Sequence, residues 1–430
     1  MGTQSLPLHD EQAWLKLDNA AKIYPAAGKK ATPPVFRISV TLRNPIRVSA
    51  LTASLQRLID RTPYYQMFIR RGFFWYFLER HKQYPHVEKM PEEPISEISL
   101  RKGSQQLIRV FARRSTIAID FSHVLADGYG GMVFTASLIT DYLRELGHDI
   151  PVPDHLLDPG SAVAPEEYED AYQSIYRKET SKAENQRPAY HIGGSPSGGY
   201  RTITGTLPVA DVLSAAKRHG ATLTEYIVAA KMYAIKGIYD EQKQSRIPPR
   251  NSIVRIEVPV NMRKLFPSRT MRNFSLFVAP EIDLGLGDYS FEEIVKGVHH
   301  QMNIQVERNQ LLRQIARNVG GEKSRLVRLI PRGIKYAYLS HLRRTIGNRT
   351  HSGVVSNLGR FSLPAGAEAH VDSVGFVLGA NDAYKVACSV VSFRDDLFLT
   401  IGSVLENRAL ERGFFRQFVR DGLPVTISER

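Results

Sequence analysis

The stretch TIAIDFSHVLADGYGG, residues 116–131, decides the fold that we expect for this chain. Its first six residues are mostly apolar and include β-branched threonine and isoleucine, which predicts a strand. His123 follows that strand, three residues form a short turn, and Asp127-Gly128 begins a helix. The order strand, turn, helix places His123 at a strand end, where side chains commonly face a cleft.

His123 has the chemistry of a general base. A neutral imidazole accepts a proton from a hydroxyl at neutral pH, and such catalysis accelerates a reaction roughly 10²–10⁴-fold. Asp127 stands four residues later, where it either orients the ring or braces the turn, and Gly128 permits a close backbone approach. A histidine that only packs and hydrogen-bonds at a strand end is the alternative interpretation of the same residues.

Strands and helices alternate on both sides of this stretch. In the first half, hydrophobic periodicity predicts strands at 35–42, 67–70, 73–78, 107–111 and 116–121 and helices at 49–60 and 128–146. In the second half it predicts strands at 201–207, 253–260, 274–278, 354–357, 374–378, 385–393 and 397–404 and helices at 209–219, 223–239, 291–319 and 410–420. Thr222 and Glu225 match a capping box. Mixed strands and helices in each half predict two α/β sandwiches.

A segment rich in glycine, serine and proline separates the two halves. Residues 188–200 include GGSPSGG, a composition that does not build a packed element. We therefore expect an N-terminal subdomain over 1–187, a linker over 188–200 and a C-terminal subdomain over 201–430.

The composition is that of a globular protein, with 43% hydrophobic and 23% charged residues among 430. No apolar run reaches the ~18 residues of a membrane span, and residues 1–6 lack the pattern of a secretory signal. The single cysteine, Cys388, excludes an intramolecular disulfide and a cysteine-based zinc cluster. These features predict a protein of the reducing cytoplasm without a metal centre.

The net charge of +14 favours a polyanionic partner. No base-stacking or groove-reading motif is present, so we do not expect nucleic acid to be the polyanionic partner. Segment 308–349 concentrates the charge, with eleven Lys or Arg and one acid among interleaved apolar residues. Three roles stay open for this segment: a solvated helix face over a core stripe, contact with CoA phosphates or an acidic carrier protein, or peripheral contact with an anionic membrane.

Several motifs carry a resemblance to a known superfamily. FSHVLADG at 121–128 is similar to the HxxxDG motif of the CoA-dependent acyltransferases, which include chloramphenicol acetyltransferase and peptide-synthetase condensation domains. WLKLDNAAKIYP at 14–25 resembles bacterial alcohol acetyltransferases. Three further stretches resemble the same superfamily in the expected order: ATLTEY at 221–226, VPVNMR at 258–263 followed by NFSL at 273–276, and VSNLG at 355–359.

The resemblance implies two chloramphenicol acetyltransferase-like subdomains around a central tunnel, with His123 midway. It implies that His123 takes the proton from an acceptor hydroxyl or amine and returns it to the leaving thiolate. It also implies that Asp127 pairs with an arginine, for which Arg263 matches the motif. Ser122 stands where many members carry a first histidine, a change that plant BAHD enzymes also tolerate. The BAHD signature DFGWG is absent, so a plant-type enzyme is not expected.

Four polar residues are candidates for stabilising an oxyanion or lining the tunnel. Ser356 and Asn357 end a predicted strand, and Asn273 and Ser275 belong to the second-half motif. Hydrogen bonding within turns and strand ends is the alternative role for all four.

We therefore expect an acyltransferase that uses acyl-CoA, acetyl-CoA included, and a small or lipophilic alcohol, with no tightly bound cofactor. One alternative is condensation-type amide or ester formation from a carrier-protein-bound acyl group. Another is a catalytically degenerate carrier-docking module. Because two fused halves supply the interface that the chloramphenicol enzyme obtains as a trimer, the resemblance favours a monomer.

Overall fold

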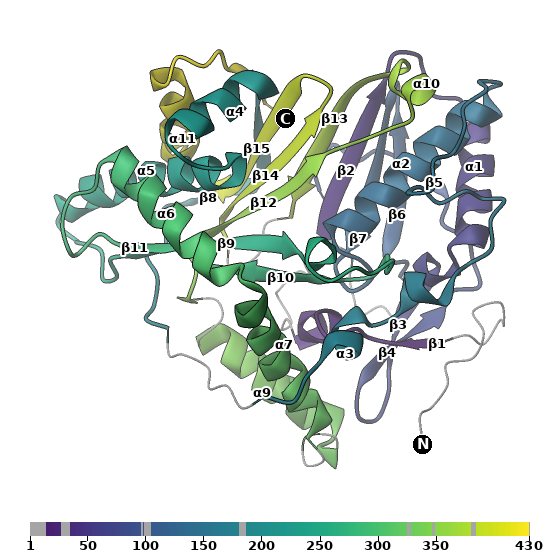
Figure 1. Cartoon of the computed structure of the whole chain (residues 1–430), viewed down its shortest axis with the longest axis horizontal. Helices are drawn as coiled ribbons and strands as arrows, with labels where there is room; N and C mark the ends of the chain where they lie inside the picture. Colours follow the sequence, from purple (N-terminus) through teal and green to yellow (C-terminus); the bar gives the residue numbers. More distant parts are fainter. Residues whose placement is uncertain are drawn as a thin grey trace.

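The computed structural model describes residues 14–26, 35–95, 98, 105–179, 186–324, 327, 329–345, 349–379 and 384–429. The expectation drawn from residues 1–6 lies outside this part of the chain. Figure 1 shows the strands running between two groups of helices, with α1 (Val48–Arg61) and α2 (Gly128–Glu145) over one group of strands. Helices α4 (Val209–Arg218), α5 (Leu223–Lys243) and α11 (Ala409–Arg420) gather over the other.

The first half is built on a five-stranded and a three-stranded sheet. The larger sheet has the order β13-β2-β7-β6-β5 and the smaller one β1-β4-β3. Their strands are β1 (Trp14–Lys16), β2 (Val35–Leu42), β3 (Met67–Arg71), β4 (Tyr76–Arg80), β5 (Val87–Lys89), β6 (Ile108–Arg113), β7 (Thr116–Ser122) and β13 (Val371–Leu378). Short helical segments join them: η1 (Ala21–Ala26), η2 (Pro63–Tyr65), η3 (Pro165–Tyr168) and α3 (Ala171–Ile175).

Strand β7 positions the motif. It pairs antiparallel with β2 on one side and β6 on the other, and every residue after Thr116 is buried because both faces of the strand are covered. Pairing with β2 ends where Ser122 lies opposite Val35. The next residue, His123, therefore leaves the sheet at its end, as the sequence predicts.

The second half is built on an eight-stranded sheet. Its order is β10-β9-β12-β14-β15-β8-β16, with β11 paired to β9. Its strands are β8 (Pro196–Pro208), β9 (Ile253–Asn261), β10 (Ser275–Val278), β11 (Glu281–Asp283), β12 (Gly353–Arg360), β14 (Val386–Phe393), β15 (Asp396–Leu405) and β16 (Thr426–Glu429). The remaining helices are η4 (Met262–Lys264), α6 (Phe291–Gln305), α7 (Arg308–Lys323), α9 (Arg332–Thr345) and α10 (Ala365–Glu368). The capping box is confirmed, since Thr222 and Glu225 exchange both hydrogen bonds at the beginning of α5.

The single helix expected over 291–319 is wrong. The chain leaves the helix at Val306 and Glu307, which divides it into α6 and α7. Val295 and Val298 of α6 pack into the core of the second sheet, whereas Leu311 of α7 packs into a separate cluster. One straight helix cannot bury its apolar stripe against both cores, so the chain turns between them.

The second half contributes a strand to the first-half sheet. Strand β13, although it comes late in the sequence, pairs antiparallel with β2 and completes the first-half sheet. It thereby satisfies backbone groups at an edge that would otherwise be open.

Strand β8 begins at Pro196, inside the segment expected to be a linker, because Pro196 lies opposite Leu405. The division of the chain at 188–200 into subdomains stays a prediction.

Helices α7 and α9 lie on the same side of the molecule as the hairpin of β3 and β4 (Figure 1). Within the described ranges, no helix is both long and apolar enough to cross a membrane.

Candidate active site

A cavity of about 1810 Å³ lies between the two halves, and His123 forms part of its wall. The first half also contributes Tyr24 and Gly128, while the second half contributes Ser275 and Ser356. Pockets for one small molecule typically measure roughly 300–1,000 Å³. The volume is therefore large enough for more than one small molecule.

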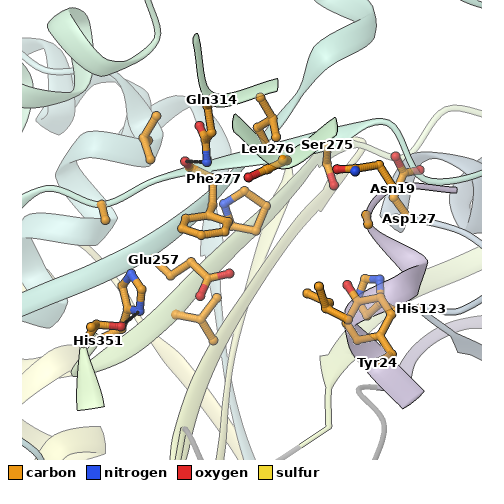
Figure 2. Close-up of a pocket in the computed structure, with 18 of the residues that line it drawn as sticks. Asn19, Tyr24, His123, Asp127, Glu257, Ser275, Leu276, Phe277, Gln314 and His351 are labelled. Carbon is orange, nitrogen blue, oxygen red and sulfur yellow. Dashed lines mark hydrogen bonds between the residues drawn. The ribbon is translucent and has the colours of Figure 1, made fainter. Parts of the chain in front are cut away.

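Two aromatic rings hold His123 in place. The ring of Tyr24 stacks on it with centroids 5.7 Å apart, and the ring of Phe36 lies 4.7 Å away. Figure 2 shows His123 and Tyr24 together on one side of the cavity. The imidazole is half-buried. Tyr24 was part of a sequence resemblance, but nothing in the sequence indicated that it contacts the histidine.

Burial dominates the electrostatics of His123. It lowers the pKa of the imidazole to about 4, although the charge of Asp127 and hydrogen bonding to Ala126 and Asn273 act in the opposite direction. The ring is therefore neutral at physiological pH. A neutral ring has a free lone pair, which a proton acceptor requires.

Asp127 braces the turn that follows His123. It caps α2, where Oδ1 accepts a hydrogen bond from the Gly130 amide at 3.1 Å. Oδ2 accepts from the Phe274 amide at 2.8 Å and from Arg263 Nη1 at 2.7 Å. Among the described residues no hydrogen bond joins Asp127 to the imidazole, so of the two roles left open the structure favours bracing.

Arg263 reaches Asp127 from the other half of the chain. Its Nε and Nη2 both donate to the Thr270 carbonyl, at 2.9 and 2.7 Å, and Nη2 also donates to the Arg272 carbonyl at 2.6 Å. The guanidinium lies over the Tyr129 ring, 4.6 Å from its centre. Both charged side chains are nearly inaccessible to solvent. The ion pair implied by the sequence resemblance is therefore present and buried.

Asn273 lies behind the histidine instead of in the cavity wall. It is 1% exposed, and its Nδ2 donates to the His123 carbonyl at 2.9 Å and to Asp18 Oδ2 at 3.1 Å. The expectation that Asn273 lines a tunnel is therefore not met, because both amide hydrogens are committed to buried acceptors. No separate sequence signal pointed to Asp18, whose pKa is raised by burial to about 6 against the opposing charge of Arg272.

The other candidates do reach the cavity. Ser275, Ser356 and Asn357 all line it. The Asn357 amide is already engaged, since Nδ2 donates to Thr224 Oγ1 at 2.9 Å and Oδ1 accepts from the Gly359 amide at 2.8 Å. In the described part of the chain, the Ser356 hydroxyl has no hydrogen-bond partner, which leaves it able to donate to a ligand.

Glycines at the beginning of α2 let the two halves approach. A Cβ on Gly128 would lie 2.4 Å from Leu358 Cδ2, and a Cβ on Gly130 would lie 2.1 Å from the Met271 carbonyl oxygen. Gly130 is therefore a steric requirement of the interface, because the atom it faces is backbone, whereas the Leu358 side chain opposite Gly128 has a flexible end that can shift.

Two polar side chains, Glu257 and His351, lie across the cavity from His123 (Figure 2). Glu257 on β9 accepts a hydrogen bond from the Tyr384 hydroxyl. His351 is 7% exposed, and burial, with the charge of Arg255, lowers its pKa to about 4. Sequence reasoning missed these residues, because they come from separate segments and match no motif. In the described ranges, no group of three or more His, Cys, Asp or Glu side chains is arranged to hold a metal ion.

Comparison with known proteins rests on structure. No family model and no curated protein sequence matches this chain. The fold is similar to that of trichothecene 15-O-acetyltransferase from Fusarium sporotrichioides, at 13% identity and a TM-score of 0.61 over 97% of both chains. It is also similar to polyketide synthase associated protein 5 from Mycobacterium tuberculosis, at 12% identity and a TM-score of 0.59 over 94% of this chain and 97% of that one.

A third similar structure is the starter condensation domain of rhizomide synthetase, solved with C8-CoA and Leu-SNAC. It shares 13% identity and a TM-score of 0.57 over 95% of this chain and 93% of that one. At these identities the comparisons establish the fold. The predicted fold class is confirmed: the chain has the α/β architecture of condensation domains and chloramphenicol acetyltransferase-like acyltransferases.

Proposed function

We propose that this protein moves an acyl group from acyl-CoA onto an alcohol hydroxyl, with His123 as the general base. The observation that carries the proposal is a neutral imidazole in the wall of a large cavity between the two halves. A group that must accept a proton needs this state, and two reactants need this space.

The reaction follows from one proton acceptor. The acceptor hydroxyl gives its proton to His123 while its oxygen attacks the thioester carbonyl and forms a tetrahedral oxyanion. The carbon–sulfur bond then breaks, the carbonyl reforms as an ester, and the imidazolium returns the proton to the leaving thiolate. His123 ends neutral, and no covalent enzyme intermediate is required.

The surrounding residues have supporting roles in this proposal. The hydroxyl of Ser356 is the preferred oxyanion donor, because the Asn357 amide is already hydrogen-bonded. Ser275 offers a second hydroxyl in the cavity wall. Asp127 and Arg263 act as positioning residues, since they hold the turn and do not contact the imidazole through a hydrogen bond.

Two alternatives have an observation in their favour. A carrier-bound donor and an amide or ester product would suit the basic segment 308–349 and the likeness to condensation domains. A degenerate docking module would suit Ser122, whose buried side chain accepts a hydrogen bond from the Val124 amide and does not line the cavity. The monomeric state and the cytoplasmic location stay predictions.

The test is a donor and acceptor panel. Purified protein is incubated with acetyl-CoA, longer acyl-CoA or an acyl carrier protein, each with alcohols and amines. Free thiol and product mass are then followed. Ester formation from acyl-CoA supports the proposal, and amide or ester formation from the carrier alone supports the condensation alternative. Absence of product from every pair, with a folded protein, would leave the docking module as the better account.

A further inference from the structure

Large apolar side chains are exposed at the tip of the β3–β4 hairpin, just before α9 and along α9. Phe73 is 74% exposed, Leu329 70%, Tyr338 64%, Ile334 63% and Phe74 40%. Ile334 and Tyr338 are four residues apart and share one face of α9. We call these five residues the apolar tip.

Hydrogen bonds hold the hairpin against α9. The Arg332 amide donates to the Phe73 carbonyl at 3.0 Å, and Arg332 Nε donates to the Gly72 carbonyl at 2.9 Å. Lys335 Nζ donates to the Phe74 carbonyl at 3.3 Å and lies 3.7 Å from the centre of a Trp75 ring. The hairpin and α9 are therefore fixed to each other, with Lys335 only 5% exposed beneath the Trp75 ring.

The charge of the neighbouring segment is one-sided. Residues 308–349 contain eleven Lys or Arg and a single acid, Glu322. Glu322 faces inward, where it accepts hydrogen bonds from Asn19 and Lys22 of the first half and from Gln173 at 3.4 Å. Of the cations that the structure describes in this segment, Arg308, Arg313, Arg317 and Lys323 of α7 are exposed, whereas Lys335 of α9 is buried, and the one carboxylate is used internally.

The apolar tip also borders the cavity. Ile334 and Tyr338 line the same cavity as His123, and so do Trp75, Val327, Ile330 and Leu339. Since Ile334 and Tyr338 are both exposed and part of the cavity wall, they mark a mouth of the cavity. The side chains named here are apolar, and Lys335 lines the cavity beside them, whereas the wall near His123 carries more polar groups.

We propose that the apolar tip, with the partly exposed Arg332 beside it, docks on an anionic lipid bilayer and places this mouth against the lipid. Phe73 and Phe74 enter the interfacial region, and Arg332 together with the exposed cations of α7 contacts anionic headgroups. The observations favour a bilayer over an acidic carrier protein. A carrier would pair with the cations but would leave the apolar tip exposed to solvent, whereas a bilayer takes up both. Delivery of a lipophilic acceptor or acyl chain to His123 through this mouth rests on the proposed function, whereas the docking itself does not.

Vesicle sedimentation tests the docking without any assay of activity. The full chain is mixed with phosphatidylcholine vesicles, with and without phosphatidylglycerol, over a range of NaCl concentrations. Binding is expected to require phosphatidylglycerol and to weaken with salt. The double variant Phe73→Ser/Phe74→Ser is expected to lower the partition coefficient about tenfold or more, since two exposed aromatic rings no longer insert.

Matched controls separate insertion from folding and from catalysis. Ile247→Ser/Leu286→Ser removes two apolar side chains outside the tip that are more exposed than Phe73 and Phe74, and it should leave vesicle binding unchanged. His123→Ala should bind vesicles like the wild type. Circular dichroism checks that each variant is folded.

The outcomes are distinct. No binding to either vesicle, or equal binding by the tip variant and the wild type, would overturn the docking proposal. Capture of an acidic acyl carrier protein that depends on Phe73 and Phe74, without vesicle binding, would overturn it too and assign the tip to a carrier. Vesicle binding by a protein that transfers no acyl group would support the docking and count against the proposed function alone.

Discussion

The carboxylate of Asp127 and the guanidinium of Arg263 meet at 2.7 Å across the two halves of the chain. Asp127 belongs to the helix that follows the catalytic candidate, and Arg263 belongs to the turn after β9. The pair therefore links the position of His123 to the docking of one half on the other.

Removing the cation should destabilise the protein strongly. Arg263→Met leaves a buried carboxylate without its partner, so we expect the free energy of unfolding in urea to fall by about 3–5 kcal/mol. Arg408→Met is the matched control, because the Arg408–Glu429 pair is exposed and should contribute only about 0–1 kcal/mol. Equal losses in the two variants would contradict the bracing role.

Gly130 should not tolerate a side chain. An added Cβ would lie 2.1 Å from the Met271 carbonyl oxygen, which is backbone and can move only if the halves separate. Gly130→Ala should therefore lower the free energy of unfolding by an overpacking cost of about 1–3 kcal/mol, and with it the melting temperature. Gly297→Ala in α6 is the control, since its Cβ meets nothing within 4 Å and alanine favours a helix. A melting temperature unchanged by Gly130→Ala would argue against this close approach.

Asn273 should affect turnover more than substrate binding. Asn273→Ala removes the donor that holds the His123 carbonyl and leaves Asp18 without one partner. A misplaced base reduces turnover, so kcat should fall about tenfold or more while KM changes little. Asn251→Ala is the matched control, because it removes a comparable amide that donates to the Ala189 carbonyl outside the cavity. A rise in KM with unchanged kcat would place Asn273 in substrate binding instead.

The pH dependence of the free energy of unfolding should report the lowered pKa of His123. The folded-state pKa of His123 is about 4, below its ordinary value of 6.5, so the unfolded chain binds the extra proton between these values. Stability contributed by the neutral ring is thus complete above about pH 6.5 and is lost as the pH falls toward 4. In urea unfolding across this window, His123→Gln should show a shallower slope than the wild type. Identical slopes would mean that His123 has an ordinary pKa.

Local signals in the sequence predicted the elements around the motif well. The apolar run before His123 became β7, and Asp127-Gly128 became the beginning of α2. Thr222 and Glu225 formed their capping box, because three residues of spacing suffice to specify it. In each case the physics acts within a few residues.

Long-range relationships were beyond local patterns. Nothing in residues 371–378 indicates that β13 completes the first-half sheet, since any edge strand of suitable length meets that need. The break between α6 and α7 depends on two separate cores. Asn273 was expected in the cavity wall, yet it is buried and its amide donates to Asp18 and to the His123 carbonyl, both distant in sequence.

The central claim is that His123 is the proton acceptor, and the most direct measurement is thiol release from acyl-CoA by His123→Ala. With the best donor and acceptor from the panel, we expect turnover to fall roughly 10²–10⁴-fold. His155→Ala, an exposed histidine outside the cavity, should keep the wild-type rate. A folded His123→Ala protein that releases thiol as fast as the wild type would contradict the account.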